Sequence, residues 1–291
     1  MNGITVTDMR VLPGDSGFLI DDGKTSILYD TGFGFTGNEM ARKIKDYLCE
    51  RSLDYIFLTH SHYDHALGSA YILRHFPEAK VVAGEYTKKV FTSDGARKTM
   101  KDLDRKFADK CGFGEYEFLG DELRVDIAVK DGDIIHAGNM TFTAVHLPGH
   151  TKCSFGYYCE DKKILLSTET LGVYDGEDTI VPSFLVGYEM AAESIKRAGK
   201  LEIDYLLAPH YGILSKEQTS FFLENMLAET ENLCDFIVNL IKAGRTDEEI
   251  IEEFKLRYRK RYIEKIYPMD AVNLNTSIMI NLIKKEILGI C

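Results

Sequence analysis

The stretch His60-Ser61-His62-Tyr63-Asp64-His65 is the most informative part of this 291-residue chain. It places three imidazoles and one carboxylate within six residues, directly after the apolar run Tyr55-Ile56-Phe57-Leu58. A short aromatic and β-branched run that stops at a polar turn is typical of a buried strand, expected here over residues 54–58. Alternate residues of an extended chain share a face, so His60, His62 and Asp64 are expected to converge.

Imidazole nitrogens and carboxylate oxygens are ligands that zinc and iron accept. His65 breaks the alternation, which fits a turn into a helix predicted over residues 66–76. The alternative is a histidine-rich turn in which Asp64 only caps that helix. Four ligand-type residues at this spacing favour a metal site.

Bulk composition narrows the class of protein. The net charge of −11 argues against a nucleic-acid partner, because such binding depends on Lys and Arg that neutralise phosphates. No basic region followed by an apolar run is visible over residues 1–7, and no stretch approaches the ~20 apolar residues that cross a bilayer. Six scattered cysteines without a C-x-x-C pair indicate reduced thiols. We therefore expect a cytoplasmic protein without a membrane segment.

The two parts of the chain differ in periodicity. Strands alternate with helices up to about residue 213, with helices expected over residues 38–49 and 188–198. Beyond residue 216, apolar residues recur at three- and four-residue steps, as on a long amphipathic helix that ends at residues 243–245. A capping box opens the next helix at Thr246, and a last helix is expected over residues 271–288. The predicted domains are 1–213 and a helical extension, 214–291, packed on it.

Three further ligand-type side chains follow apolar, strand-like runs. His150 lies in the turn Leu147-Pro148-Gly149-His150-Thr151, Glu169 follows Ile164-Leu165-Leu166, and His210 follows Tyr205-Leu206-Leu207. Taken alone, each would more often be an ordinary loop residue than a ligand, and Glu169 most of all. Their common position after a strand, as at His60, favours a shared metal site.

These ordered motifs, together with Asp30-Thr31-Gly32, resemble the metallo-β-lactamase superfamily over about residues 4–213. The resemblance implies an α/β fold, a four-layer αβ/βα sandwich with the site at one edge. It assigns His60, His62 and His150 to one metal ion, and Asp64, His65 and His210 to a second. Glu169 stands where the family usually has an aspartate that bridges both ions. Its extra methylene changes the reach of the carboxylate, so occupancy of the second site stays open. Asp30 is expected to orient a ligating histidine, the alternative being an aspartate that only forms the turn before Gly32.

The resemblance implies a binuclear hydrolase in which a metal-bound hydroxide attacks the substrate. Zinc is the favoured ion, with iron and manganese as alternatives. Asp64 is expected to orient the hydroxide and pass on its proton. Tyr211 is expected to donate a hydrogen bond to a developing oxyanion, the alternative being a packing aromatic.

The expected substrate is a thioester or ester of a small molecule, because the layout is similar to that of glyoxalase II and related thioesterases with carboxy-terminal helices. A phosphodiesterase of the same fold is one alternative, and a catalytically weak regulatory member that binds a ligand is another. Diiron reductases of this superfamily fit less well, since they usually carry Glu where His62 stands and append a flavin domain. Formation of a homodimer through the C-terminal helices is left open.

Overall fold

The computed structural model describes residues 3–290 and divides into two compact units. Unit one comprises residues up to 146 together with 155–162, and unit two comprises 147–154 together with 163 onward. The helices after residue 213 therefore belong to the same compact unit as the strands that follow residue 163. The domain boundary predicted at 213/214 stays a prediction.

Unit one contains a six-stranded sheet with the order β1-β2-β3-β4-β5-β6. The first two pairings are antiparallel, and the pairings from β3 to β6 are parallel. The strands are β1 (Thr5–Asp8), β2 (Phe18–Asp21), β3 (Ser26–Tyr29), β4 (Tyr55–Phe57), β5 (Lys80–Gly84) and β6 (Ile127–Val129). Parallel neighbours end at the same edge of a sheet, so the residues after β3 and β4 lie close together.

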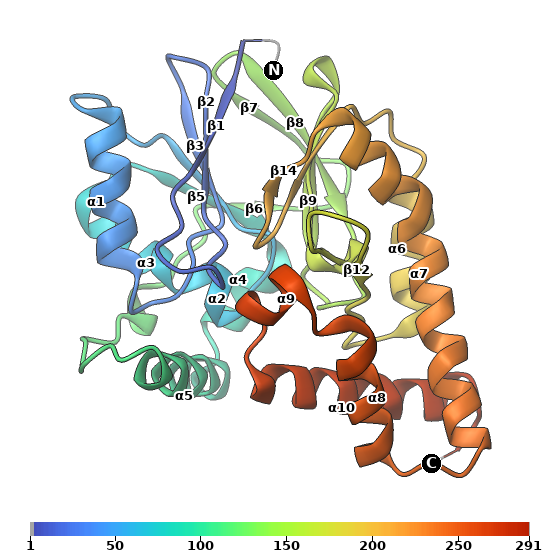
Figure 1. Ribbon diagram of the computed structural model, residues 1–291. Coiled ribbons are helices and arrows are strands. Elements are labelled where there is room, and N and C mark those ends of the chain that lie inside the picture. The colour runs from blue at the N-terminus through green and yellow to red at the C-terminus, as the bar shows by residue number, and fades with distance from the viewer. Residues whose placement is uncertain (1–2, 291) are drawn as a thin grey trace. The chain divides into compact units, whose positions relative to one another are not determined.

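Helices and an antiparallel meander complete unit one (Figure 1). The helices are α1 (Gly37–Leu48), α2 (Tyr63–Ala66), α3 (Gly68–His75), α4 (Glu85–Phe91) and α5 (Asp94–Lys110), with short 3₁₀ turns η1 (Gly120–Glu122) and η2 (Glu160–Lys162). The meander is β7 (Ile134–Ala137), β8 (Met140–His146) and β9 (Phe155–Cys159). The apolar face of α1, formed by Met40, Ile44 and Leu48, is buried in the core of this unit.

Unit two combines short strands with the C-terminal helices. Its strands and 3₁₀ turn are β10 (Ile164–Leu166), η3 (Glu169–Leu171), β11 (Val173–Tyr174), β12 (Ile180–Val181), β13 (Tyr205–Ala208) and β14 (Gly212–Ile213). Its helices are α6 (Tyr188–Ala198), α7 (Lys216–Lys242), α8 (Asp247–Tyr258), α9 (Arg261–Ile266) and α10 (Met269–Glu286), the last four drawn in orange to red in Figure 1. The strands β10 and β13 are parallel neighbours.

The predicted helix ends in unit two are largely confirmed. Thr246 caps α8, and its hydroxyl accepts from the Glu249 amide while the Glu249 carboxylate accepts from the Thr246 amide. The last helix begins at Met269, two residues before the predicted start, because Pro268 occupies the N-cap position. The short helix α9 was not predicted. Six residues make fewer than two turns, so apolar periodicity cannot reveal such a helix.

Candidate metal centre

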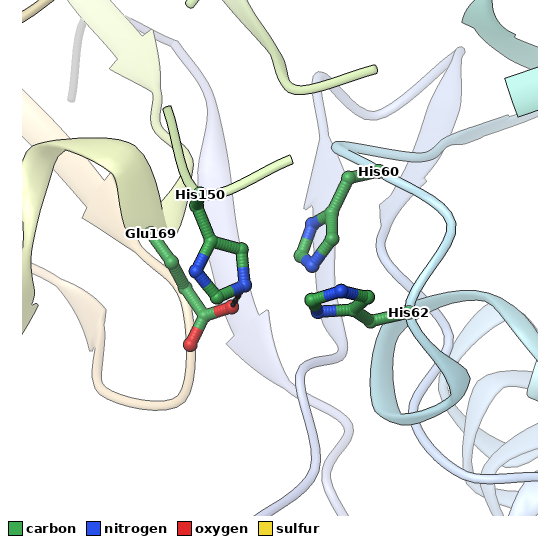
Figure 2. A group of neighbouring side chains, drawn as sticks. All are labelled: His60, His62, His150 and Glu169. Atoms are coloured by element: carbon green, nitrogen blue, oxygen red, sulfur yellow. Dashed lines mark ion pairs between the residues drawn. The ribbon is translucent and has the colours of Figure 1, made fainter. Parts of the chain in front are cut away.

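In unit one, the potential ligands occupy the turn that joins β4 to α2. His60 follows β4, His62 is the N-cap residue of α2, and Asp64 and His65 lie within that helix. The ring of His60 lies 4.5 Å from that of His62 and 4.1 Å from that of His65, measured between centroids. Figure 2 shows the His60 and His62 rings turned toward one another. The structure thus brings together all the unit-one residues that the sequence predicted as ligands.

A buried carboxylate directly after β3 orients this group. Asp30 is fully buried, and its Oδ2 accepts from His65 Nδ1 at 2.8 Å. The Thr59 hydroxyl donates to Asp30 at 3.0 Å and lies 2.9 Å from His60 Nδ1. The Thr59 amide and the Ser16 hydroxyl donate to the same carboxylate. Asp30 therefore fixes His65 directly and His60 through Thr59. That these histidines bind metal stays a prediction.

In unit two, the potential ligands also follow strand ends. Glu169 comes after β10 and His210 after β13, at the shared edge of two parallel strands. His210 occupies the left-handed region, with φ of +62°, in the tight turn between β13 and β14. His150 follows Gly149, whose φ is +144° and where a Cβ would lie 2.6 Å from Ala191 of α6. Only glycine permits this approach, so the turn that carries His150 is anchored against α6.

The Glu169 carboxylate lies between two histidines. Its Oε2 is 2.8 Å from Nε2 of His150, drawn as a dashed line in Figure 2, and its Oε1 is 3.2 Å from Nε2 of His210. All three side chains are more than nine-tenths buried. Glutamate thus reaches both histidines at once, one with each oxygen.

The hydrogen-bond network assigns the tautomers of three histidines. His150 Nδ1 faces the Ser183 carbonyl oxygen at 3.2 Å and the Ser183 hydroxyl at 2.8 Å, and a carbonyl oxygen only accepts. His65 Nδ1 faces the Asp30 carboxylate, and His60 Nδ1 faces a hydroxyl that already donates to Asp30. Each ring therefore carries a proton on Nδ1, which leaves Nε2 as the nitrogen available to a metal ion.

This arrangement fits divalent metal ions. Nε2 of His150 and Oε2 of Glu169 lie 2.8 Å apart, and two such acceptor atoms stay this close only when a metal ion or a proton lies between them. Imidazoles whose Nδ1 is tied to a protein oxygen are typical metal ligands. The donor atoms are nitrogen and oxygen, which zinc, iron and manganese all accept.

Tyr211, predicted to act on an oxyanion, packs between other aromatic side chains. Its ring lies 5.3 Å from that of Tyr174 and 5.8 Å from that of Tyr262, and its hydroxyl accepts from Gln218 Nε2 at 3.2 Å. Its catalytic role stays a prediction. The Tyr267 hydroxyl, by contrast, contacts the side chain of a candidate ligand, because it donates to Glu169 Oε1 at 3.0 Å. No sequence motif marked Tyr267, which directly follows the short helix α9.

The histidines His75, His136 and His146 belong to neither group of potential ligands. His75 and His136 are exposed, and the His146 ring packs on Phe155 at 4.9 Å. No disulfide joins Cys49, Cys111, Cys153, Cys159 or Cys234, the cysteines within the described range.

Unit two also contains a mostly apolar cleft among α8, α9 and α10. Its walls include Phe254, Ile263, Val272 and Met279. Ser183 and Tyr267, which contact His150 and Glu169 respectively, line the same cleft. At its present width the cleft has room for about one water molecule.

Comparison with known proteins identifies the family. The family model of the metallo-beta-lactamase superfamily matches residues 10–210, so the chain belongs to this superfamily. The metallo-beta-lactamase fold-containing protein ST1585 of Sulfurisphaera tokodaii is 26% identical over 72% of this chain and 77% of its own length. The human acyl-coenzyme A thioesterase MBLAC2 is 24% identical over 73% of this chain and 78% of its own length.

Solved structures confirm the fold. The metallo-beta-lactamase family protein TTHA1429 from Thermus thermophilus matches with a TM-score of 0.65 at 17% identity, covering 99% of this chain and 95% of its own. The ST1585 structure matches with a TM-score of 0.58 at 22% identity, covering 78% and 85%. The predicted α/β metallo-β-lactamase fold with C-terminal helices is thus confirmed. Among residues 3–290, no helix combines the length and the apolar character needed to cross a membrane.

Proposed function

We propose that this chain is a metal-dependent hydrolase that cleaves a thioester or ester bond of a small molecule. The proposal rests on one observation: a chain of this superfamily contains two groups of histidine and carboxylate side chains that could each hold a metal ion. His60, His62, His150 and Glu169 would hold one divalent ion, and Asp64, His65 and His210 the second. Glu169, which contacts both His150 and His210, would then bridge the two ions. Zinc is the favoured metal, with iron and manganese as alternatives.

When bound, such ions lower the pKa of a coordinated water to about 7 and polarise a carbonyl oxygen. The protein's own residues would orient and transfer protons. Asp30 holds the ring of His65 in one tautomer by a direct hydrogen bond, and it holds the ring of His60 through the Thr59 hydroxyl. The Asp64 carboxylate, whose Oδ2 lies 3.8 Å from His65 Nε2, is partly exposed and can accept the proton of the attacking water. It can then return that proton to the leaving thiolate or alkoxide.

Two observations support an acyl substrate. MBLAC2, which aligns with 73% of this chain, is an acyl-coenzyme A thioesterase, and Dictyostelium glyoxylase B2 is 28% identical over 47% of the chain. The cleft that reaches Ser183 and Tyr267 has mainly apolar walls, which suit a hydrocarbon better than a polyanion. Entry of an acyl group requires that the walls of the cleft move apart, because the cleft is narrow.

The proposal is tested with the purified full-length chain and a panel of acyl thioesters, carboxylic esters and phosphodiesters. We expect thioester or ester turnover that disappears with a strong chelator and returns with zinc. His62→Ala should lower kcat/KM by about 100-fold or more and reduce the bound metal, since it removes a ligand. His136→Ala, which removes an exposed imidazole on β7, is the matched control and should change neither quantity.

Hydrolysis of phosphodiesters alone would favour the phosphodiesterase alternative. Tight binding of a ligand without turnover would favour a regulatory protein. Unchanged metal content and unchanged turnover in His62→Ala would contradict the assignment of the site.

A further inference from the structure

The segment formed by α9 and its flanking residues is bonded to the unit-two ligands at two points. The Tyr262 hydroxyl donates to the His210 carbonyl oxygen at 2.7 Å, and the Tyr267 hydroxyl donates to Glu169 Oε1 at 3.0 Å. The segment is fixed at its start by Arg261, which pairs with the buried carboxylate of Asp175 at 3.1 Å and with Asp178 at 2.6 Å. A part of the helical extension thus contacts a residue that is proposed to bind metal.

A glutamate at position 169 is more mobile than an aspartate and is therefore stabilised by a hydrogen bond to its carboxylate. Compared with aspartate, its side chain has one more rotatable bond, and the terminal carboxylate rotates in a broad energy well. A carboxylate that contacts two histidines, one with each oxygen, keeps both contacts only if its orientation is fixed. Oε2 is directed at His150 and Oε1 at His210, and the Tyr267 hydroxyl binds Oε1. The Tyr267 hydrogen bond therefore opposes rotation of the carboxylate at the oxygen that faces His210.

We propose that Tyr267 is a positioning residue that holds Glu169 Oε1 in the direction of the second metal ion, the ion assigned to Asp64, His65 and His210. This inference rests on the proposed two-ion hydrolase and deepens it. It assigns a role in the metal centre to the helical extension, which would otherwise only line the substrate cleft. Hydrogen-bond partners of metal ligands typically contribute 10–100-fold to metal affinity.

The first test measures metal affinity rather than activity. The metal-free full-length chain is titrated with zinc against a chelating dye, and with cobalt while its absorption spectrum is recorded. We expect Tyr267→Phe to bind the first ion as the wild type does and the second ion about 10–100-fold more weakly. Tyr174→Phe is the matched control, because it also removes one hydroxyl of unit two, donated at 2.8 Å to the Glu177 carbonyl. It should bind both ions with wild-type affinity.

A double-mutant cycle separates positioning from general stability. Glu169→Asp shortens the side chain by one methylene and withdraws the carboxylate from Tyr267. In that background, Tyr267→Phe should change the affinity for the second ion by less than about threefold, because the hydrogen bond is already lost. A merely structural role of Tyr267 would give the same loss in both backgrounds, and would contradict the inference.

The outcomes distinguish this inference from the proposed function. If the wild type binds two ions and Tyr267→Phe binds both equally well, the inference is wrong and the hydrolase proposal stands. If the wild type binds fewer than two ions, the two-ion proposal fails and the inference fails with it. Retention of the ring in Tyr267→Phe preserves packing in the cleft, and an unchanged Tm of the metal-free variant would verify this.

Discussion

At the scale of single residues, Asp30 shows how a buried charge is tolerated and used. Its carboxylate is fully buried and accepts from the Ser16 hydroxyl, the Thr59 amide and hydroxyl, and His65 Nδ1. A buried charge without such partners costs several kcal/mol. Asp30 also has a φ of +53°, a conformation that Asp and Asn adopt more readily than most residues. The residue therefore serves both the turn after β3 and the orientation of the histidines.

Asp30→Asn tests this role while keeping the turn. Asparagine tolerates the left-handed conformation, but its amide group cannot accept from all these donors. We expect the zinc affinity to fall by about 10–100-fold and the stability by roughly 1–3 kcal/mol. Competition with a chelating dye and urea denaturation measure the two effects. Wild-type zinc affinity in a folded Asp30→Asn protein would show that Asp30 does not orient the ligands.

At the scale of elements, helix α5 is attached to the loop after β3 through Asp104. This buried side chain accepts from the Gly34 amide at 3.1 Å and from the Tyr116 hydroxyl. Burial raises the pKa of Asp104 to about 7, against an ordinary value of 3.8, although the hydrogen bonds from Tyr116 and Gly34 act in the opposite direction. The negative charge of Asp15 also raises this pKa. The attachment of α5 is thus sensitive to pH.

The sign of the effect on stability follows from the raised pKa. Between about pH 4 and pH 7 the folded chain keeps a proton on Asp104 that the unfolded chain releases, so stability decreases as the pH rises through this range. We expect Asp104→Asn to remove a decrease of the order of 2–4 kcal/mol between pH 4 and pH 7. Urea denaturation at several pH values measures it. Asp102→Asn, an exposed change on the same helix, should retain the wild-type profile.

The elements differ in how well the sequence predicted them. Helices α1 and α6 were predicted to within one residue at each end, and the end of α7 and the start of α8 were also predicted, because apolar periodicity and end signals mark them. The charged region 85–110 forms α4 and α5, and Ser93 caps the start of α5. Helix α9 was missed, and with it Tyr267. Apolar periodicity predicts long amphipathic helices, whereas it cannot predict short segments that tertiary contacts hold in place.

At the scale of the whole molecule, the proposed ligands come from both compact units, His60, His62, Asp64 and His65 from the first and His150, Glu169 and His210 from the second. Metal ions bound as proposed would therefore stabilise both units together, since an ion that binds the folded state alone shifts the folding equilibrium. The amount of bound metal would then depend on both units being folded.

Removal of metal tests this coupling. We expect a chelator to lower Tm, by an amount that corresponds to about 3 kcal/mol when the free ion is at 100 times its Kd. His60→Ala in unit one and His210→Ala in unit two should each reduce the shift, because each removes a ligand from one unit. Calorimetry with and without zinc measures it. If neither substitution alters the shift in Tm, the ions do not bind at the proposed residues.

The family, the α/β class and the candidate ligands could all be inferred without a structure. The candidate ligands follow short apolar runs that predict buried strands. Both features lie within a few residues of one another, so a local pattern is enough to recognise them. The hydrogen-bond partners of those ligands became apparent only from the packing of the chain. Ser183 contacts His150, Thr59 lies between His60 and Asp30, and Tyr267 donates to Glu169. Ser183 and Tyr267 lie 33 and 98 residues along the chain from the ligands they contact. Hydrogen bonds over such separations depend on how the chain packs, and no local sequence pattern records that packing.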